Sequence, residues 1–64
     1  MGTVELAKMT SPQAGEALAR AEVAIVPVGA TEQHGPNLSL ETDTAIADHL
    51  ARRIAEALFP RAVV

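Results

Sequence analysis

The sequence predicts an α/β fold in which an N-terminal helix precedes a strand–helix–strand (βαβ) unit with parallel strands. Three observations predict it: a helix-start signal near residue 10, an uninterrupted β-branched run at 23–28, and a helical period over 44–58. Residues 61–64 then read as the opening of another strand. Because a crossover between parallel strands is right-handed, the topology of this unit is expected to be right-handed too.

The first helix has a capping signal in Thr10-Ser11-Pro12-Gln13. Either hydroxyl can accept from a free amide of the first turn, where proline is tolerated, and the Gln13 side chain can reach back to the cap. The next residues place Ala14, Ala17, Leu18 and Ala21 on one stripe. Glu16 and Arg20 are spaced for an i, i+4 ion pair on another stripe, so we expect that pair to form.

The first strand is expected at Val23–Val28. The run is apolar without alternation, which is typical of a strand buried on both faces of a parallel sheet. Pro27 lacks the donor that a central ladder position requires, so it should lie near the end of the strand or at a sheet edge. Gly29 then ends the strand and lets the chain turn.

The second helix is expected from Thr44 to Leu58, with Thr42 as its cap and Asp43 in its first turn. The face expected to pack on the core carries four large side chains flanked by alanines: Ile46, Leu50, Ile54 and Leu58 with Ala47, Ala51 and Ala57. The opposite face repeats charges of alternating sign at Asp48, Arg52 and Glu56, as solvated helix faces do. Pro60 should stop the helix.

Length and composition limit what the chain can be. It has 64 residues, a net charge of −3, no Cys and one aromatic residue, Phe59. So small and alanine-rich a chain is marginally stable alone, and we expect it to be the N-terminal piece of a larger domain. Without Cys there are no disulfides or thiolate metal sites. The chain has no basic cluster for nucleic acid, no apolar run of about 20 residues for a membrane, and no signal peptide, so a cytoplasmic location is expected.

The loop from Gly29 to Asp43 concentrates the chemistry of the sequence. Glu32, His34 and Asp43 offer carboxylate and imidazole ligands, which suit Zn, Mn, Fe or Ni. In an extended segment Glu32 and His34 share a face, because strand side chains repeat every two residues. Three ligands are too few for two metal ions, so further ligands would come from elsewhere. Alternatively, the two carboxylates cap amides and His34 bonds a carbonyl group.

The motif carries a family resemblance. Residues 26–36, VPVGATEQHGP, followed by Leu38, Leu40 and Thr42-Asp43, resemble the N-terminal signature of the creatininase (creatinine amidohydrolase) family. That signature reads P-x-G-S/A-x-E-Q-H-G-P-H-L-P-L-x-T-D, and the resemblance extends over nearly the whole chain from about residue 6. Asn37 stands where the pattern has a second His and Ser39 where it has Pro. These departures bear on loop rigidity and substrate preference rather than on the metal ligands.

The resemblance implies a three-layer α/β/α fold, of which residues 1–64 would be the N-terminal fragment of a single creatininase-like domain. It implies hydrolysis of C–N bonds in cyclic amides or related small molecules, through a hydroxide held by two divalent ions, Zn or Mn. Glu32 would bind one ion, His34 the other, and Asp43 would bridge them. Two further ligands would come from a later loop that this chain lacks. Family members assemble as hexamers, and the 64-residue chain alone is expected to be inactive.

Two other interpretations stay open. The chain can be a non-catalytic fragment or small interaction module that retains the motif. A phosphate-binding βαβ domain fits less well, because the loop lacks Lys and its acids would repel phosphate. His49 lies on the second helix beside Arg53 and is read as a surface or subunit-contact histidine rather than a ligand.

Overall fold

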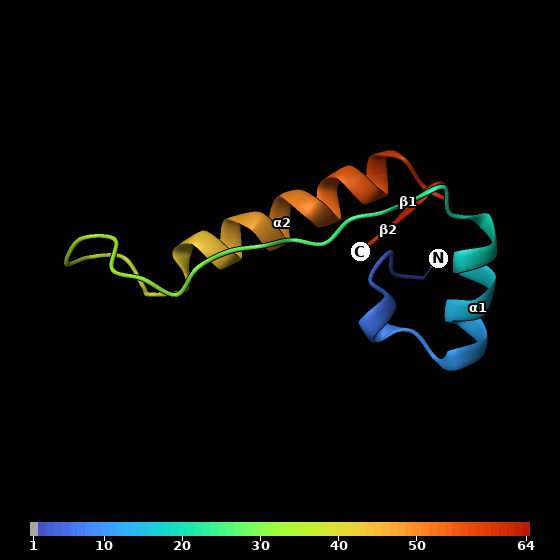
Figure 1. The fold of residues 1–64 in the computed structure, drawn as a ribbon, viewed down its shortest axis with the longest axis horizontal. Coiled ribbons are helices and arrows are strands. Elements are labelled where there is room, and N and C mark those ends of the chain that lie inside the picture. The colour runs from blue at the N-terminus through green and yellow to red at the C-terminus, as the bar shows by residue number, and fades with distance from the viewer. Residues whose placement is uncertain (1) are drawn as a thin grey trace.

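The computed structural model describes residues 2–64. The elements follow in the order η1 (Leu6–Lys8, a 3₁₀ turn), α1 (Ser11–Arg20), β1 (Val23–Ala24), α2 (Thr42–Ala57) and β2 (Ala62–Val63). The molecule is elongated, measuring 43 × 21 × 18 Å. Figure 1 shows α2 along the long axis, with α1 and both strands gathered at one end and a loop at the other. Within residues 2–64, no helix has the length and apolar character needed to cross a membrane.

Helix α1 begins as its sequence predicts. Thr10 is the cap, its hydroxyl accepts from the Gln13 amide, and the Gln13 side chain accepts from the Thr10 amide. This reciprocal pair satisfies two amides that a helix start would otherwise leave open. The expected ion pair between Glu16 and Arg20 is not among the ion pairs of residues 2–64. Instead, the Arg20 guanidinium lies 5.5 Å from the centre of the Phe59 ring, in a cation–π contact.

The two strands are parallel and separated in sequence by α2, which confirms the predicted βαβ unit. Val23 pairs with Ala62 and Ala24 with Val63. The other edge of β2 is also occupied, because the Val64 amide donates to the Val4 carbonyl and the Leu6 amide donates to the Val64 carbonyl, each at 2.9 Å. Strand β2 therefore lies between β1 and the extended N-terminal residues.

Strand β1 is shorter and more exposed than expected. Its last ladder bond runs from the Ile25 amide to the Val63 carbonyl at 2.8 Å. Val26 and Val28 are 78% and 80% exposed. The expectation of burial on both faces was wrong here, because a strand is buried on two faces only when helices cover both, and within residues 2–64 α2 is the helix that packs most closely on the sheet.

Helix α2 starts two residues earlier than expected, and its cap differs. Glu41 holds the cap position without a side-chain bond, and Thr42 is the first helical residue. The Thr42 hydroxyl does not cap the helix; it donates to the Ser39 carbonyl oxygen at 2.7 Å. Asp43 lies in the first turn as predicted, where the helix dipole favours a carboxylate.

The core is built from small residues. Ala51 and Ala55 of α2 are buried, together with Val4, Ala62 and Val63. The prediction that the large aliphatic stripe would face the core was wrong, because Ile46, Leu50 and Ile54 remain 49–56% exposed. The alanines lie about 100° further round the helix, as consecutive helical residues do. Their small side chains let α2 approach β2 closely, and the larger side chains remain on its flank.

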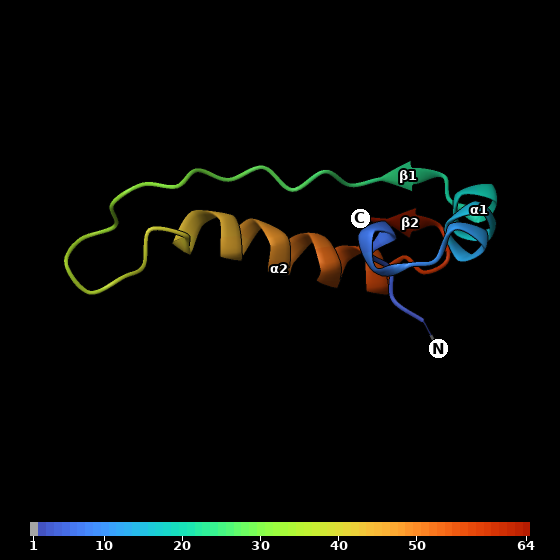
Figure 2. The same ribbon diagram turned by 90° about the horizontal axis from the view of Figure 1, so that it is seen from below.

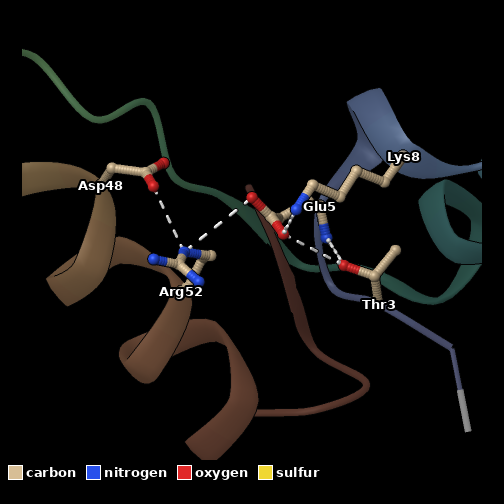
Figure 3. A network of polar contacts seen from close by, with 5 residues as sticks. All are labelled: Thr3, Glu5, Lys8, Asp48 and Arg52. Atoms are coloured by element: carbon tan, nitrogen blue, oxygen red, sulfur yellow. Dashed lines mark hydrogen bonds and ion pairs between the residues drawn. The ribbon is translucent and has the colours of Figure 1, made fainter. Parts of the chain in front are cut away.

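A polar network joins the charged side of α2 to the N-terminal residues (Figure 3). Arg52 lies 3.3 Å from a carboxylate oxygen of Asp48 and 3.9 Å from one of Glu5, and Lys8 lies 3.2 Å from Glu5. The Glu5 amide also donates to the Thr3 hydroxyl. The charged side of α2 therefore faces the N-terminal residues on one edge of β2. The aliphatic stripe lies on the other side of α2, where Ile46, Leu50 and Ile54 are about half exposed.

Candidate metal centre

The motif loop lies at the end of the molecule opposite the packed strands. After β1 the chain runs along α2 in both views and turns beyond the N-terminus of that helix (Figure 2). Residues 25–40 form no helix or strand. Gly35 makes the turn with a φ of +73°, a backbone conformation that other residues adopt rarely.

Glu32 and His34 lie together on one side of the loop. A Glu32 carboxylate oxygen, Oε1, is 3.7 Å from Nε2 of His34, with the side chains 57% and 27% exposed. That distance is too long for a hydrogen bond. The Nε2 atom is shielded from solvent and has no hydrogen-bond partner in the described part of the chain. The two residues thus form a close pair of ligand-type atoms, one of which is unsatisfied.

Asp43 is engaged elsewhere. Its Oδ2 atom accepts a hydrogen bond of 3.0 Å from the main-chain amide of Ala30. Between residues 2 and 64 there is no cluster of three His, Cys, Asp or Glu side chains that could hold a metal ion. The structure therefore brings together two of the three proposed ligands and keeps Asp43 apart from them.

The pair nevertheless has the chemistry of a metal site. A neutral imidazole nitrogen and a carboxylate oxygen are both ligands for divalent zinc and manganese. A cation between them would satisfy the unpartnered Nε2 atom and neutralise the carboxylate beside it. Glu32 and His34 fit two positions of a metal centre, and the remaining ligands have to come from Asp43 or from outside these residues.

Contacts at the base of the loop went unrecognised in the sequence. The Glu32 amide donates to the Leu40 carbonyl at 3.1 Å. Gly29 lies directly against Thr44, where a Cβ atom added to the glycine would come within 2.5 Å of the Thr44 Cα. For Asp43, the alternative that its carboxylate caps a main-chain amide is the arrangement observed. Nothing in the residue pattern indicated which amide that would be.

A cavity of about 220 Å³ lies at the packed end, between α1, the N-terminal residues and the turn before β2. Glu16, Arg20 and Phe59 are among the residues that line it, and the motif residues are not. The motif loop and this cavity are separate features at opposite ends of the molecule.

Comparison with known families identifies the motif. A sequence model of the creatininase family, described as creatinine amidohydrolase, matches residues 7–64. The match includes both strands, both α-helices and the whole loop between them. No solved structure matches the chain.

Curated relatives are similar over shorter segments. The mycofactocin precursor peptide peptidase of Mycobacterium tuberculosis is 53% identical over 34 residues, which are 53% of this chain and 14% of the peptidase. The peptidase of the same name in Mycolicibacterium smegmatis is 59% identical over 32 residues, 50% of this chain and 13% of that protein. The 3-dehydro-scyllo-inosose hydrolase of Thermotoga maritima is 40% identical over 47 residues, 73% of this chain and 15% of the hydrolase. The matched segments thus span about a seventh of these relatives.

Proposed function

The chain belongs to the creatininase family, and on that premise we propose that it supplies part of the metal centre of a hydrolase that cleaves C–N bonds in amides. The observation that carries this proposal is the pair formed by Glu32 and His34. The Nε2 atom of His34 is shielded and unpartnered, 3.7 Å from a carboxylate oxygen of Glu32.

The proposed ligands are Glu32, His34 and Asp43, with Zn or Mn as the ions. When bound, such cations polarise a carbonyl oxygen and lower the pKa of a water molecule toward neutrality. The role of this chain is to hold the ligands. The extended backbone places Glu32 and His34 on one face, and α2 carries Asp43 at the base of the same loop.

The proposed substrate class is an amide, with peptides included. The names of the similar proteins describe peptidases and a hydrolase. A peptidase cleaves a C–N bond, the same bond type that the family description, creatinine amidohydrolase, implies. In the full-length protein we also propose a homo-oligomer, a hexamer by family resemblance.

A second function is proposed beside the first. The chain is then a non-catalytic fragment or small interaction module that retains the motif, and hydrolysis would require ligands from further sequence. Zinc or manganese and an amide substrate panel, supplied to the 64-residue chain, should accordingly give no turnover.

The test of the proposed function is a graft. Residues 7–64 replace the corresponding segment of the Mycobacterium tuberculosis peptidase, which supplies the missing part of the fold. We expect the graft to retain bound metal and cleavage of its precursor peptide, and His34→Gln to lose both. His49→Gln is the matched control, since His49 is an exposed histidine on α2, and it should retain both. Full metal content and cleavage in the folded His34→Gln graft would contradict the proposal.

A further inference from the structure

The base of the motif loop is closed by three successive contacts between its two ends. Gly29 abuts Thr44, the Ala30 amide bonds Asp43, and the Glu32 amide bonds Leu40. The contacts move inward from both ends of the loop, so that residues 33–39 form its tip. Because Ala30 and Glu32 are both bonded, the segment that carries the Glu32–His34 pair is fixed to the start of α2.

Gly29 has to be glycine for reasons of space. A Cβ atom at this position would lie 2.5 Å from Cα of Thr44 and 2.7 Å from its main-chain nitrogen. Those are backbone atoms of a helix, so no side-chain rotation can relieve the overlap. Gly35 differs, because space around it is open and its positive φ imposes the requirement. The two glycines of the motif are therefore needed for different physical reasons.

Asp43 provides the polar half of the same closure. Only its Oδ2 atom is used by the Ala30 amide. A carboxylate has two oxygens and about four acceptor sites, so one group can hold an amide and still coordinate an ion. Ala30 lies two residues before Glu32. The bond between Ala30 and Asp43 therefore links the position of Glu32 to that of Asp43.

We propose that Gly29 is a positioning residue for the metal ligands and that Asp43 anchors the loop through the Ala30 amide. This inference rests on the proposed function. The close approach of Gly29 to α2 lets Ala30 reach Asp43, and the anchored Ala30 holds Glu32 and His34 at a fixed place beside the helix start. Groups that orient metal ligands typically change metal affinity by about 10–100-fold when they are removed.

The experiment uses the ¹⁵N-labelled 64-residue chain with Gly29→Ala and, as a matched control, Gly15→Ala. Gly15 lies in α1, where an added Cβ atom would meet open space. Hydrogen exchange is measured at the Ala30 and Glu32 amides, and zinc is titrated while the His34 ring resonances are followed. We expect Gly29→Ala to speed exchange at both amides and weaken zinc binding about tenfold or more. Gly15→Ala should neither speed exchange at the Ala30 and Glu32 amides nor weaken zinc binding. In Gly29→Ala, exchange at the Ala51 and Ala55 amides should stay as in the wild-type chain.

A second pair of variants separates the anchor from the ligand. Asp43→Asn keeps an oxygen that can accept from the Ala30 amide, whereas Asp43→Ala removes it. Protection of the Ala30 amide should survive in Asp43→Asn and be lost in Asp43→Ala, and zinc binding should weaken in both. These changes lie at the loop, so they remain informative if Gly29→Ala prevents folding.

Two results would overturn the inference. One is unchanged exchange at Ala30 in both Gly29→Ala and Asp43→Ala. The other is lost protection at Ala30 with wild-type zinc affinity in Gly29→Ala. If zinc leaves the His34 resonances of the wild-type chain unchanged, the positioning role is overturned, whereas the proposed function is decided separately by metal content and cleavage in the graft. Faster exchange in Asp43→Ala would then still establish the anchor as a structural contact.

Discussion

At its C-terminal end α2 packs Ala51 and Ala55 onto β2, whereas at its N-terminal end it meets the rest of the chain through the Thr44 backbone and the Asp43 carboxylate. The first end is held by apolar burial and a parallel ladder. The second is held by hydrogen bonds and one close backbone approach, with Val28 beside it 80% exposed. Stability and the proposed metal chemistry therefore depend on different residues, and substitutions can change one without the other.

The largest effect on the packed end is expected from Ala55→Leu. Ala55 is fully buried, and overpacking of a filled core costs about 1–3 kcal/mol. In a domain of this size each kcal/mol lowers Tm by roughly 4–8 °C, so the chain should melt far earlier or fail to fold. Thermal unfolding followed by circular dichroism measures this. Ala57→Leu, at an exposed position of the same helix, is the control, and equal melting of the two variants would contradict the assigned core.

A smaller effect is expected from Thr10→Ala. The Thr10 hydroxyl caps α1 and accepts from the Gln13 amide, and loss of such a cap costs about 0.5–2 kcal/mol. The Tm should fall. Hydrogen exchange at the Ala30 amide, at the other end of the molecule, should change only as much as the loss of global stability requires. Ser11→Ala provides the comparison, because Ser11 is the first helical residue and Thr10 is the cap. A larger drop in Tm for Ser11→Ala than for Thr10→Ala would show that Ser11, rather than Thr10, caps α1.

The smallest effect is expected from Leu50→Gln. Leu50 is 54% exposed, and substitutions at exposed sites usually change the free energy of unfolding by less than about 0.5 kcal/mol. A core role for the aliphatic stripe, as its helical period predicts, would instead make the loss several kcal/mol. Equilibrium urea unfolding distinguishes these outcomes. A loss comparable to that of Ala55→Leu would show that the stripe is covered in solution.

Local signals in the sequence were sufficient for much of this structure. The capping box of α1, the helical period of α2 and the opening of β2 depend on neighbouring residues, and all three are present as predicted. The choice between the aliphatic and alanine stripes of α2 depends on how closely the helix approaches β2, which no local pattern encodes. For the same reason the apolar run at 23–28 predicted a buried strand, although pairing ends at Ile25 and Val26 is left exposed.

The site divides in the same way. Alternation along an extended segment was enough to place Glu32 beside His34, because both belong to one short stretch of backbone. The position of Asp43 relative to them depends on how the loop closes, through contacts between residues 13 and 15 positions apart. Composition and spacing carry no information on the amide that Asp43 accepts from. The family motif implied that Asp43 binds metal, but it did not indicate that Asp43 also bonds the Ala30 amide.

The most direct test of a partial metal centre in this loop is a zinc titration of the 64-residue chain, with the ring resonances of His34 and His49 followed together by NMR. Both histidines lie in the same molecule, so His49, exposed on α2, reports non-specific binding. We predict a weak response confined to His34 that is abolished by Glu32→Gln. Equal responses at the two histidines, or none at His34, would contradict a metal-binding role for the loop. Tight binding of two zinc ions would contradict the claim that these residues form only part of the centre.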